Sequence, residues 1–315
     1  MTAHTPMHDP LDPFVTQHVE ALEGHPDFKI LHRFVPPAAY NAGRPERLCR
    51  GIILDTEATG IDVKSDKIIE LGMVSFEFCP DTGKVYRVLG AFNQLEDPGM
   101  PIPAAAGLVN GLTDEMVAGH KIDDVAALEF VQGADIIIAH KADYDRAMVE
   151  RRFPFFDNIA WGCSLRQVDW AAEGLSAAKL DYIAFRLGFF FEGHRAEIDC
   201  RAALEALQRP LPKSGETGLT QLLRNYRRVD NRIWALDARF EKKDDLKARG
   251  YRWGDGTNGT EKAWYTDVPE EEFAAEAAWL KENIYYGRGF RLAVDTIDAT
   301  NRFSARAGNR RTVMC

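Results

Sequence analysis

Runs of apolar residues separated by turns open the main part of the chain. Three such runs follow one another closely and predict three consecutive strands, at 50–60, 67–78 and 83–95. A fourth run, "DIIIAH" (135–140), predicts another strand. Helical patterns surround it, at 122–131, 143–152, 165–173, 179–187 and 196–207. Strands followed by strands that alternate with helices predict an α/β domain with a mixed sheet over residues 50–208.

The first 49 residues do not continue this pattern. They predict a helix at 13–22, a short strand in "FKILHRF" (28–34) and then a proline-rich segment. We therefore expect residues 1–49 to be an extension that wraps onto the following domain.

The segment "RPLPKSGETG" (209–218) carries two prolines and two glycines and is the expected linker. Beyond it the pattern predicts a small α+β domain at 219–315, made of a helix, a hairpin, a second helix and a strand, at 242–250, 251–268, 269–285 and 287–297. The charges support this division. Residues 213–315 hold 19 Lys/Arg and 16 Asp/Glu, whereas the preceding residues hold 20 and 32.

Composition narrows the class of protein. With 45% hydrophobic and 28% charged residues, the chain is typical of a soluble globular protein. A net charge of −9 argues against a protein that coats nucleic acid by bulk electrostatics. The five cysteines form no C-x-x-C pair, and neither a secretory signal nor a membrane-spanning run of about 20 apolar residues is visible. The expected location is the cytoplasm, without a membrane partner.

Acidic residues stand where predicted strands end. Asp55 and Glu57 follow an apolar run, and side chains two apart on a strand share one face. Asp145 falls in the first turn of the helix after "DIIIAH", and Asp199 falls in a later helix, five residues after His194. Each has a structural interpretation alone: solvated acids at a strand end, a carboxylate favoured by a helix dipole, a surface histidine. Their combination is what indicates a site.

Four converging carboxylates would require hard divalent cations, because all-oxygen ligation suits Mg²⁺ or Mn²⁺ better than Zn²⁺. Two such ions about 4 Å apart can hold an attacking water and a leaving oxygen on opposite sides of a phosphorus atom. A neutral histidine can take the proton from that water. The chemistry that this pattern predicts is phosphodiester hydrolysis.

The blocks "DTEATG" (55–60), "HKADYD" (140–145) and "HRAEID" (194–199) resemble the three motifs of the DEDDh, or DnaQ-like, 3′–5′ exonucleases, the family of the proofreading epsilon subunit. The resemblance covers about residues 50–208. It implies an RNase H-like, five-stranded mixed sheet flanked by helices. It also implies a two-metal mechanism (Mg²⁺ or Mn²⁺), with His194 as general base and Asp55, Glu57, Asp145 and Asp199 as catalytic metal ligands.

Three positions depart from the family pattern, and the departures are expected to affect substrate binding. Ala58 lacks a usual hydroxyl, Lys141 replaces a usual Asn, and Asn110 replaces a frequent His. The resemblance places these three, with Thr56 and His140, beside the substrate. Lys141 either meets a phosphate or is a solvated surface residue.

The expected function is a 3′–5′ exonuclease acting mainly on single-stranded DNA. The alternatives are an RNA-trimming exoribonuclease and a non-catalytic nucleic-acid-binding adaptor, with protein partners unknown. In the C-terminal unit, Trp253, Trp264 and Tyr265 either stack bases or form the core of a small domain. The basic segment "RFSARAGNRR" (302–311) is either a phosphate contact or a disordered end.

Overall fold

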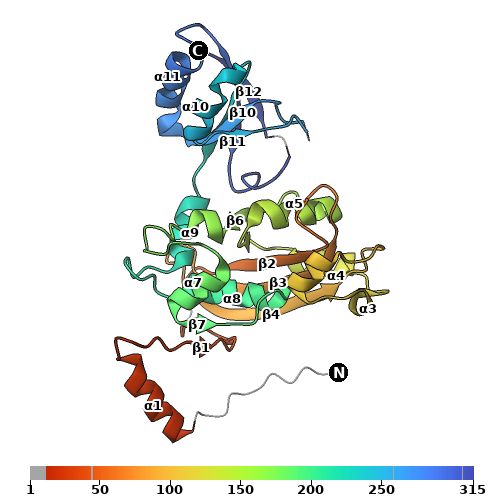
Figure 1. The fold of residues 1–315 in the computed structure, drawn as a ribbon, viewed down its shortest axis with the longest axis vertical. Coiled ribbons are helices and arrows are strands. Elements are labelled where there is room, and N and C mark those ends of the chain that lie inside the picture. Colours follow the sequence, from red (N-terminus) through yellow and green to blue (C-terminus); the bar gives the residue numbers. More distant parts are fainter. Residues whose placement is uncertain (1–11, 44, 258, 307) are drawn as a thin grey trace.

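The computed structural model describes residues 12–43, 45–257, 259–306 and 308–315. Two five-stranded sheets, one above the other in Figure 1, form the bulk of this part of the chain. Among the described residues, no helix combines the length and the apolarity that crossing a bilayer requires.

The first sheet has the strand order β4-β3-β2-β5-β6. Its strands are β2 (Cys49–Ala58), β3 (Ile68–Phe78), β4 (Val85–Leu95), β5 (Ile136–Ala139) and β6 (Trp161–Cys163). The first three pair antiparallel, whereas β5 pairs parallel with β2 and with β6. The predicted mixed, RNase H-like sheet is therefore confirmed, and β6 is the strand that the pattern did not reveal.

Both faces of this sheet are covered by helices, which explains why β2 is apolar and buried from Gly51 to Leu54, directly before Asp55. Ile53 packs into one core with helices α7 (Leu180–Leu187), α8 (Ala196–Gln208) and α9 (Gly218–Tyr226). Ile52 and Leu54 pack into the opposite core with α4 (Asp124–Val131) and α5 (Ala142–Arg152). Alternate residues of β2 thus face different helices, and the strand end presents its polar side chains to both layers.

Three short helices flank these layers: α2 (Ala104–Asn110), α3 (Asp114–Val117) and α6 (Ser164–Gln167). A 3₁₀ turn, η1, spans Pro154–Phe156. The helix predicted over 165–173 is wrong beyond Gln167. The chain turns there because Trp170 is buried in the core, where its Nε1 donates to the Ser164 carbonyl.

The N-terminal extension has the predicted elements. Helix α1 (Pro13–Glu23) begins after Asp12, whose side chain accepts from the Phe14 amide. Strand β1 (His32–Arg33) pairs parallel with β7 (Phe189–Phe190), which fastens the extension to the segment that precedes α8. In Figure 1, α1 projects away from the body of the molecule.

The second sheet is antiparallel, with the order β12-β11-β8-β10-β9. It consists of β8 (Asp230–Ala235), β9 (Arg252–Trp253), β10 (Trp264–Pro269), β11 (Arg291–Ile297) and β12 (Arg310–Met314). Helices α10 (Lys243–Ala248) and α11 (Phe273–Asn283) contribute Leu246 and Leu280 to its core, and the 3₁₀ turns η2 (Phe240–Lys242) and η3 (Glu270–Glu272) precede them. The predicted small α+β domain is confirmed as a fold.

The two cores divide later in the sequence than the expected linker. Leu219, Leu222 and Leu223 of α9 are buried in the core of the first unit, together with Leu211 from within the 209–218 segment. The second sheet begins only at Asp230. We therefore propose that the boundary lies at about 227–229.

The described residues of the basic segment, 302–306 and 308–311, are folded and do not form a free end. Its C-terminal part enters β12, where Arg310 pairs with Asp295 at 2.9 Å. Arg302 pairs with Asp230, and Arg306 pairs with Glu150 on α5 of the first unit. The expectation of a disordered end is wrong, because partners distant in sequence neutralise these arginines.

Contacts between the units centre on the edge strand β6. The Trp161 amide donates to the Ala299 carbonyl at 2.7 Å, so a C-terminal segment continues the hydrogen bonding of the first sheet. Beside it, Arg146 of α5 donates to the Thr300 carbonyl and to Glu150. Both Trp161 and Arg146 are fully buried. The C-terminal unit therefore supplies hydrogen-bond partners to β6 and α5, and its Phe303 packs against the core that contains Trp161.

Candidate active site

The carboxylates of Asp55 and Glu57 lie at the end of β2 and face α8. They share the face of Ile53, as alternation along a strand requires. Asp199, in the first turn of α8, meets them there. One ligand oxygen of each of these three acids lies within 4.8 Å of the others, close enough to hold a metal ion.

A glycine on the neighbouring strand permits this approach. Gly72 is the cross-strand partner of Asp55. A Cβ atom at this position would lie 2.4 Å from the carbonyl carbon of Ala196 and 2.5 Å from the Glu197 nitrogen, at the start of α8. Only glycine allows the backbones to come this close, and the N-terminus of α8 therefore sits over the strand end.

Asp145 reaches the site from the other helical layer. Thr56 faces α5, and its amide and hydroxyl both donate to Oδ1 of Asp145, at 3.1 and 2.8 Å. Asp145 is 3% exposed, and its charge is among those that raise the pKa of Asp55. The structure thus brings together all four acids that the sequence singled out.

Burial and mutual repulsion make this cluster hard to ionise. Burial, reinforced by the neighbouring carboxylates, raises the pKa of Glu57 to about 8 and that of Asp55 well above its ordinary value. Burial also raises the pKa of Asp145 to about 7 and of Asp199 to about 6, although backbone amides partly oppose it. Such a cluster takes up either protons or cations. The donor set, all carboxylate oxygen, fits Mg²⁺ or Mn²⁺.

A fifth acid, Glu70, was missed by sequence reasoning. It lies opposite Glu57 on β3, and its side chain is fully buried. Arg195 donates to it from Nε and Nη2, at 3.1 and 2.9 Å, and the Ala196 amide adds a third bond. This pair ties the segment before α8 to the sheet. Its signal in the sequence was the acid inside the apolar run "IIELG" (68–72).

His194 lies in that segment, directly before Arg195. Its side chain is exposed and its φ of 67° is in the left-handed region, which non-glycine residues rarely adopt. The Arg195 amide donates to Oδ2 of Asp199 at 3.0 Å, and the nearby His194 lowers the pKa of Asp199. The histidine is therefore an exposed residue in the segment that bonds Asp199.

Three of the five residues expected beside the substrate are buried. Thr56 is 6% exposed and serves Asp145, and Ala58 packs into the core beside α5. Asn110 is 4% exposed, and its Oδ1 accepts from the Leu112 amide. Thr56 and Asn110 thus form hydrogen bonds within the protein, and Ala58 packs into the core.

His140 also directs its polar atoms inward. Its Nε2 donates to the Ala178 carbonyl at 2.7 Å, and the Ser164 hydroxyl donates to its Nδ1 at 2.8 Å. Burial lowers the pKa of this imidazole, which fits a neutral ring with both nitrogens in use. Lys141, by contrast, is exposed, with its Nζ 5.5 Å from the centre of the Tyr144 ring. Of the five, Lys141 alone remains accessible.

Comparisons with known proteins place this geometry in a family. A family model described as "Exonuclease" (RNase T) matches residues 52–207. The DNA polymerase III subunit epsilon-like protein of Rhodobacter capsulatus is 35% identical over 183 residues, which are 54% of this chain and 25% of that protein. The DNA polymerase III subunit epsilon of Treponema pallidum is 25% identical over 163 residues, 48% of this chain and 71% of that one. The chain thus spans about a quarter of the first relative.

Among solved structures, exonuclease X in complex with 5′ overhanging duplex DNA is similar with a TM-score of 0.40 and 22% identity. The match covers 56% of this chain and 98% of that one.

Proposed function

Residues 52–207 belong to the exonuclease family, and from this premise we propose that the chain is a metal-dependent 3′–5′ exonuclease that acts mainly on single-stranded DNA. One observation carries the proposal: Asp55, Glu57 and Asp199 offer ligand oxygens within 4.8 Å of one another, with Asp145 beside them. The raised pKa values of Asp55 and Glu57, which are partly buried, support a site built for cations.

In this proposal the four carboxylates hold two divalent ions, Mg²⁺ or Mn²⁺. When bound, such ions supply charge neutralisation at the phosphoryl group and lower the pKa of water. The protein's part is positional. Asp55 and Glu57 are fixed on a central strand, Thr56 fixes Asp145, and the Gly72 contact fixes Asp199.

His194 is the proposed general base. Exposed in the segment that bonds Asp199, it can take a proton from an attacking water and pass it to solvent. The Arg195–Glu70 ion pair, 2.9 Å long, holds the backbone that carries it. The Arg195 amide in the same segment donates to Asp199, which keeps the base and this metal ligand at a fixed distance from each other.

DNA is the proposed polymer because the relatives named above are subunits of DNA polymerase III, or like one. The test uses matched DNA and RNA oligonucleotides labelled at either end, with Mg²⁺ or Mn²⁺. A 3′–5′ exonuclease converts the 5′-labelled strand into a ladder and releases the 3′ label at once as a mononucleotide. Faster digestion of the RNA strand would make the chain an exoribonuclease, and release of the 5′ label first would refute the polarity.

Variants connect this activity to the site. Asp55→Asn and Asp199→Asn are expected to abolish hydrolysis, and His194→Ala to lower kcat by about 10²–10⁴-fold while metal binding survives. The matched control is Glu197→Gln, an acid of the same helical turn that pairs with Arg201. Loss of activity in all of these variants alike, including the control, would point to disrupted folding instead. Full activity of Asp199→Asn would remove that acid from the site.

A further inference from the structure

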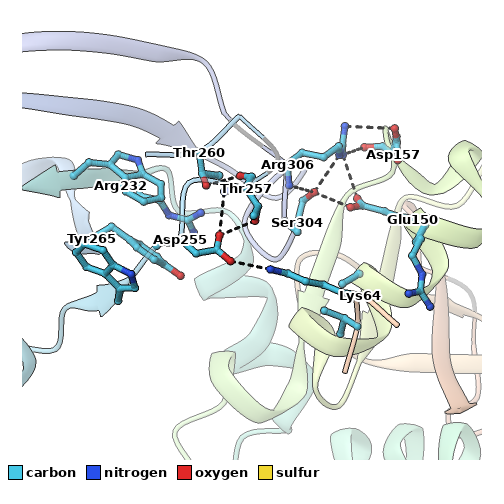
Figure 2. Close-up of a pocket in the computed structure, with 17 residues that line it drawn as sticks. Lys64, Glu150, Asp157, Arg232, Asp255, Thr257, Thr260, Tyr265, Ser304 and Arg306 are labelled. Atoms are coloured by element: carbon cyan, nitrogen blue, oxygen red, sulfur yellow. Dashed lines mark hydrogen bonds and ion pairs between the residues drawn. The ribbon is translucent and has the colours of Figure 1, made fainter. Parts of the chain in front are cut away.

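Two cavities separate the exonuclease unit from the C-terminal unit. The first, of about 720 Å³, is crossed by ion pairs that Figure 2 shows. Lys64 reaches Asp255 at 2.8 Å, and Arg306 reaches Glu150 at 3.2 Å. These ion pairs join the two units across the cavity, and they neutralise the charges that line it.

The second cavity, of about 670 Å³, has a different balance of charge. Five guanidinium groups and only three carboxylates line it: Arg166, Arg228, Arg232, Arg252, Arg302, and Asp143, Asp230, Asp267. Two of the carboxylates are shared. Asp230 receives two arginines, and so does Asp267. The cavity therefore keeps a positive excess.

The arginines at its surface are available to a ligand. The side chains of Arg166, Arg228 and Arg252 are 47%, 49% and 49% exposed. The ion pair of Arg252 with Asp267 is long, at 3.6 Å, and that of Arg228 with Asp230 is 3.3 Å. Half-exposed guanidinium groups, two of them in long ion pairs, suit phosphate oxygens, which they bind in pairs.

Buried polar atoms without hydrogen-bond partners at this cavity also favour a ligand there. Gln167 is 5% exposed and lines the cavity, yet its Nε2 has no hydrogen-bond partner in the described part of the chain. The Nε of Arg302 is buried and unpartnered in the same sense. Asp143 adds one acceptor without a partner, Oδ1, while its Oδ2 accepts a hydrogen bond from Arg166 at 2.9 Å. Gln167 Nε2 and Arg302 Nε are two donors without an acceptor, and they lie in a cavity lined by more arginines than carboxylates. This arrangement favours an anionic ligand.

The cavity adjoins the carboxylate cluster along helix α5. Asp143 lines the cavity, and Asp145 belongs to the cluster, yet both lie in the first turn of this helix. Two residues along a helix differ by about 200°, so the two sites occupy opposite sides of one helix end. A strand whose 3′ end lies at the carboxylates need only cross this turn to enter the cavity.

We propose that this cavity binds phosphodiester groups of a single strand on the 5′ side of the bond that the carboxylate cluster hydrolyses. The inference rests on the proposed function for the identity of the strand. Arg166, Arg228 and Arg252 contact the phosphates, and Gln167 supplies a neutral donor. The C-terminal unit thereby completes the substrate path.

The test measures binding without hydrolysis. The full chain carrying Asp199→Asn is titrated against 5′-fluorescein-labelled oligothymidine of about 20 nucleotides, by anisotropy, at several salt concentrations. The double variant Arg228→Gln/Arg252→Gln is expected to raise Kd about tenfold at low salt. It should also reduce the slope of log Kd against log salt by about 1.4, for two lost phosphate contacts. Arg228→Lys/Arg252→Lys should restore most of the slope.

The matched control is Arg224→Gln/Arg291→Gln, which removes two ion-paired surface arginines that do not line the cavity. It should change Kd less than twofold. Thermal unfolding of each variant checks the fold. Equal affinity of the cavity variant and this control would overturn the proposal.

Two further outcomes would also overturn it. An oligonucleotide of about three nucleotides that loses as much affinity as the long one would show that no extended strand occupies the cavity. Displacement of the long strand by inorganic phosphate alone, at the same concentration in the cavity variant and in its parent, would show that these arginines bind no phosphate. If the parent chain hydrolyses neither polymer but the length-dependent loss is found, the proposed function fails while the strand path stands.

Discussion

Thr56 donates both its backbone amide and its hydroxyl to one carboxylate oxygen of Asp145, at 3.1 and 2.8 Å. The threonine belongs to the central strand and the aspartate to the first turn of α5. Because neighbouring residues of a strand face opposite sides, Asp55 and Glu57 turn toward α8 while Thr56 turns toward α5. One short strand end therefore positions acids from both helical layers.

Thr56→Val tests this link. The change keeps the shape of the side chain and the amide bond but removes the hydroxyl, so Asp145 loses one of two donors. We expect kcat to fall about tenfold and half-saturation by Mg²⁺ to move to higher concentration, because a ligand held by one bond is less well oriented. Thr59→Val is the control, since the buried Thr59 hydroxyl donates to Asp66 instead. Equal kinetics of the two variants would mean that the Thr56 hydroxyl does not orient Asp145.

Gly72→Ala tests the approach of α8. A Cβ atom 2.4 Å from the Ala196 carbonyl carbon meets backbone, which cannot rotate away. The helix start must shift, and Asp199 with it. A misplacement of about 1 Å can cost 10²-fold in rate, and overpacking costs about 1–3 kcal/mol of stability. Kinetics and urea unfolding would measure both effects.

The control for that change is Gly90→Ala on β4, where an added Cβ atom meets nothing within 4 Å. If Gly72→Ala retained the activity of this control, the close contact between β3 and α8 would be unnecessary for the site.

The parts of the molecule that the sequence predicted well depend on local rules. Apolar runs predicted β2, β3, β4 and β5, and the acids at their ends could be assigned because strand ends and helix starts meet at one edge of such a sheet. Asp55, Glu57 and Asp145 were singled out in this way, whereas Asp199 and His194 were identified from the block "HRAEID" (194–199), which resembles the third family motif. Glu70 was not singled out, since an acid inside an apolar run resembles an interruption until its partner, Arg195, is known.

The rest depends on contacts between distant segments. Strand β6 has three residues and gains its order from pairing with β5 and from Ala299, more than 130 positions later. Helix α9 follows a proline- and glycine-containing segment that looked like a linker, and only its burial in the first core shows otherwise. The same holds for His140 and Asn110, whose polar atoms are used internally by partners that no motif names.

The raised pKa values of the carboxylate cluster predict an unusual pH dependence for the metal-free protein. Acids with folded pKa values of about 6, 7 and 8 hold protons that the unfolded chain releases near pH 4. The folded state then binds more protons, so stability falls as pH rises from about 4 to 8. Thermal unfolding in EDTA should show Tm decreasing over this range. Mg²⁺ should reverse the decrease, most strongly at pH 8.

Asp55→Asn offers the check on that interpretation. Removing one negative charge from the cluster should raise Tm at pH 8 in EDTA and largely abolish the response to Mg²⁺. Glu197→Gln, in the same turn of α8 but on the opposite side from Asp199, should behave like the parent. If the Tm of the metal-free parent protein does not change between pH 4 and 8, ionisation of the cluster does not destabilise the folded state.

The last prediction concerns removal of the C-terminal unit. On sequence grounds, a chain ending after about residue 212 would have weaker substrate affinity and unchanged kcat, or else be insoluble if the removed part covers apolar surface. The structure favours the second outcome. Truncation there removes α9, whose three leucines lie in the first core, and it removes the carbonyls that accept from the Trp161 amide and from Arg146. Exposing a large core side chain to water costs about 1.5–3 kcal/mol. Several such losses together approach the whole stability of a typical domain, about 5–15 kcal/mol.

A chain ending after Arg228 keeps α9 and isolates the role of the interface. It still loses the Ala299 and Thr300 carbonyls that accept from Trp161 and Arg146, and Glu150 loses Ser304 and Arg306. We expect it to unfold at least about 10 °C lower than the full chain and to aggregate more readily. If instead the truncated chain matches the full chain in Tm, and differs only in a higher KM on long strands that high salt abolishes, the unit acts on substrate alone and the interface contributes no stability.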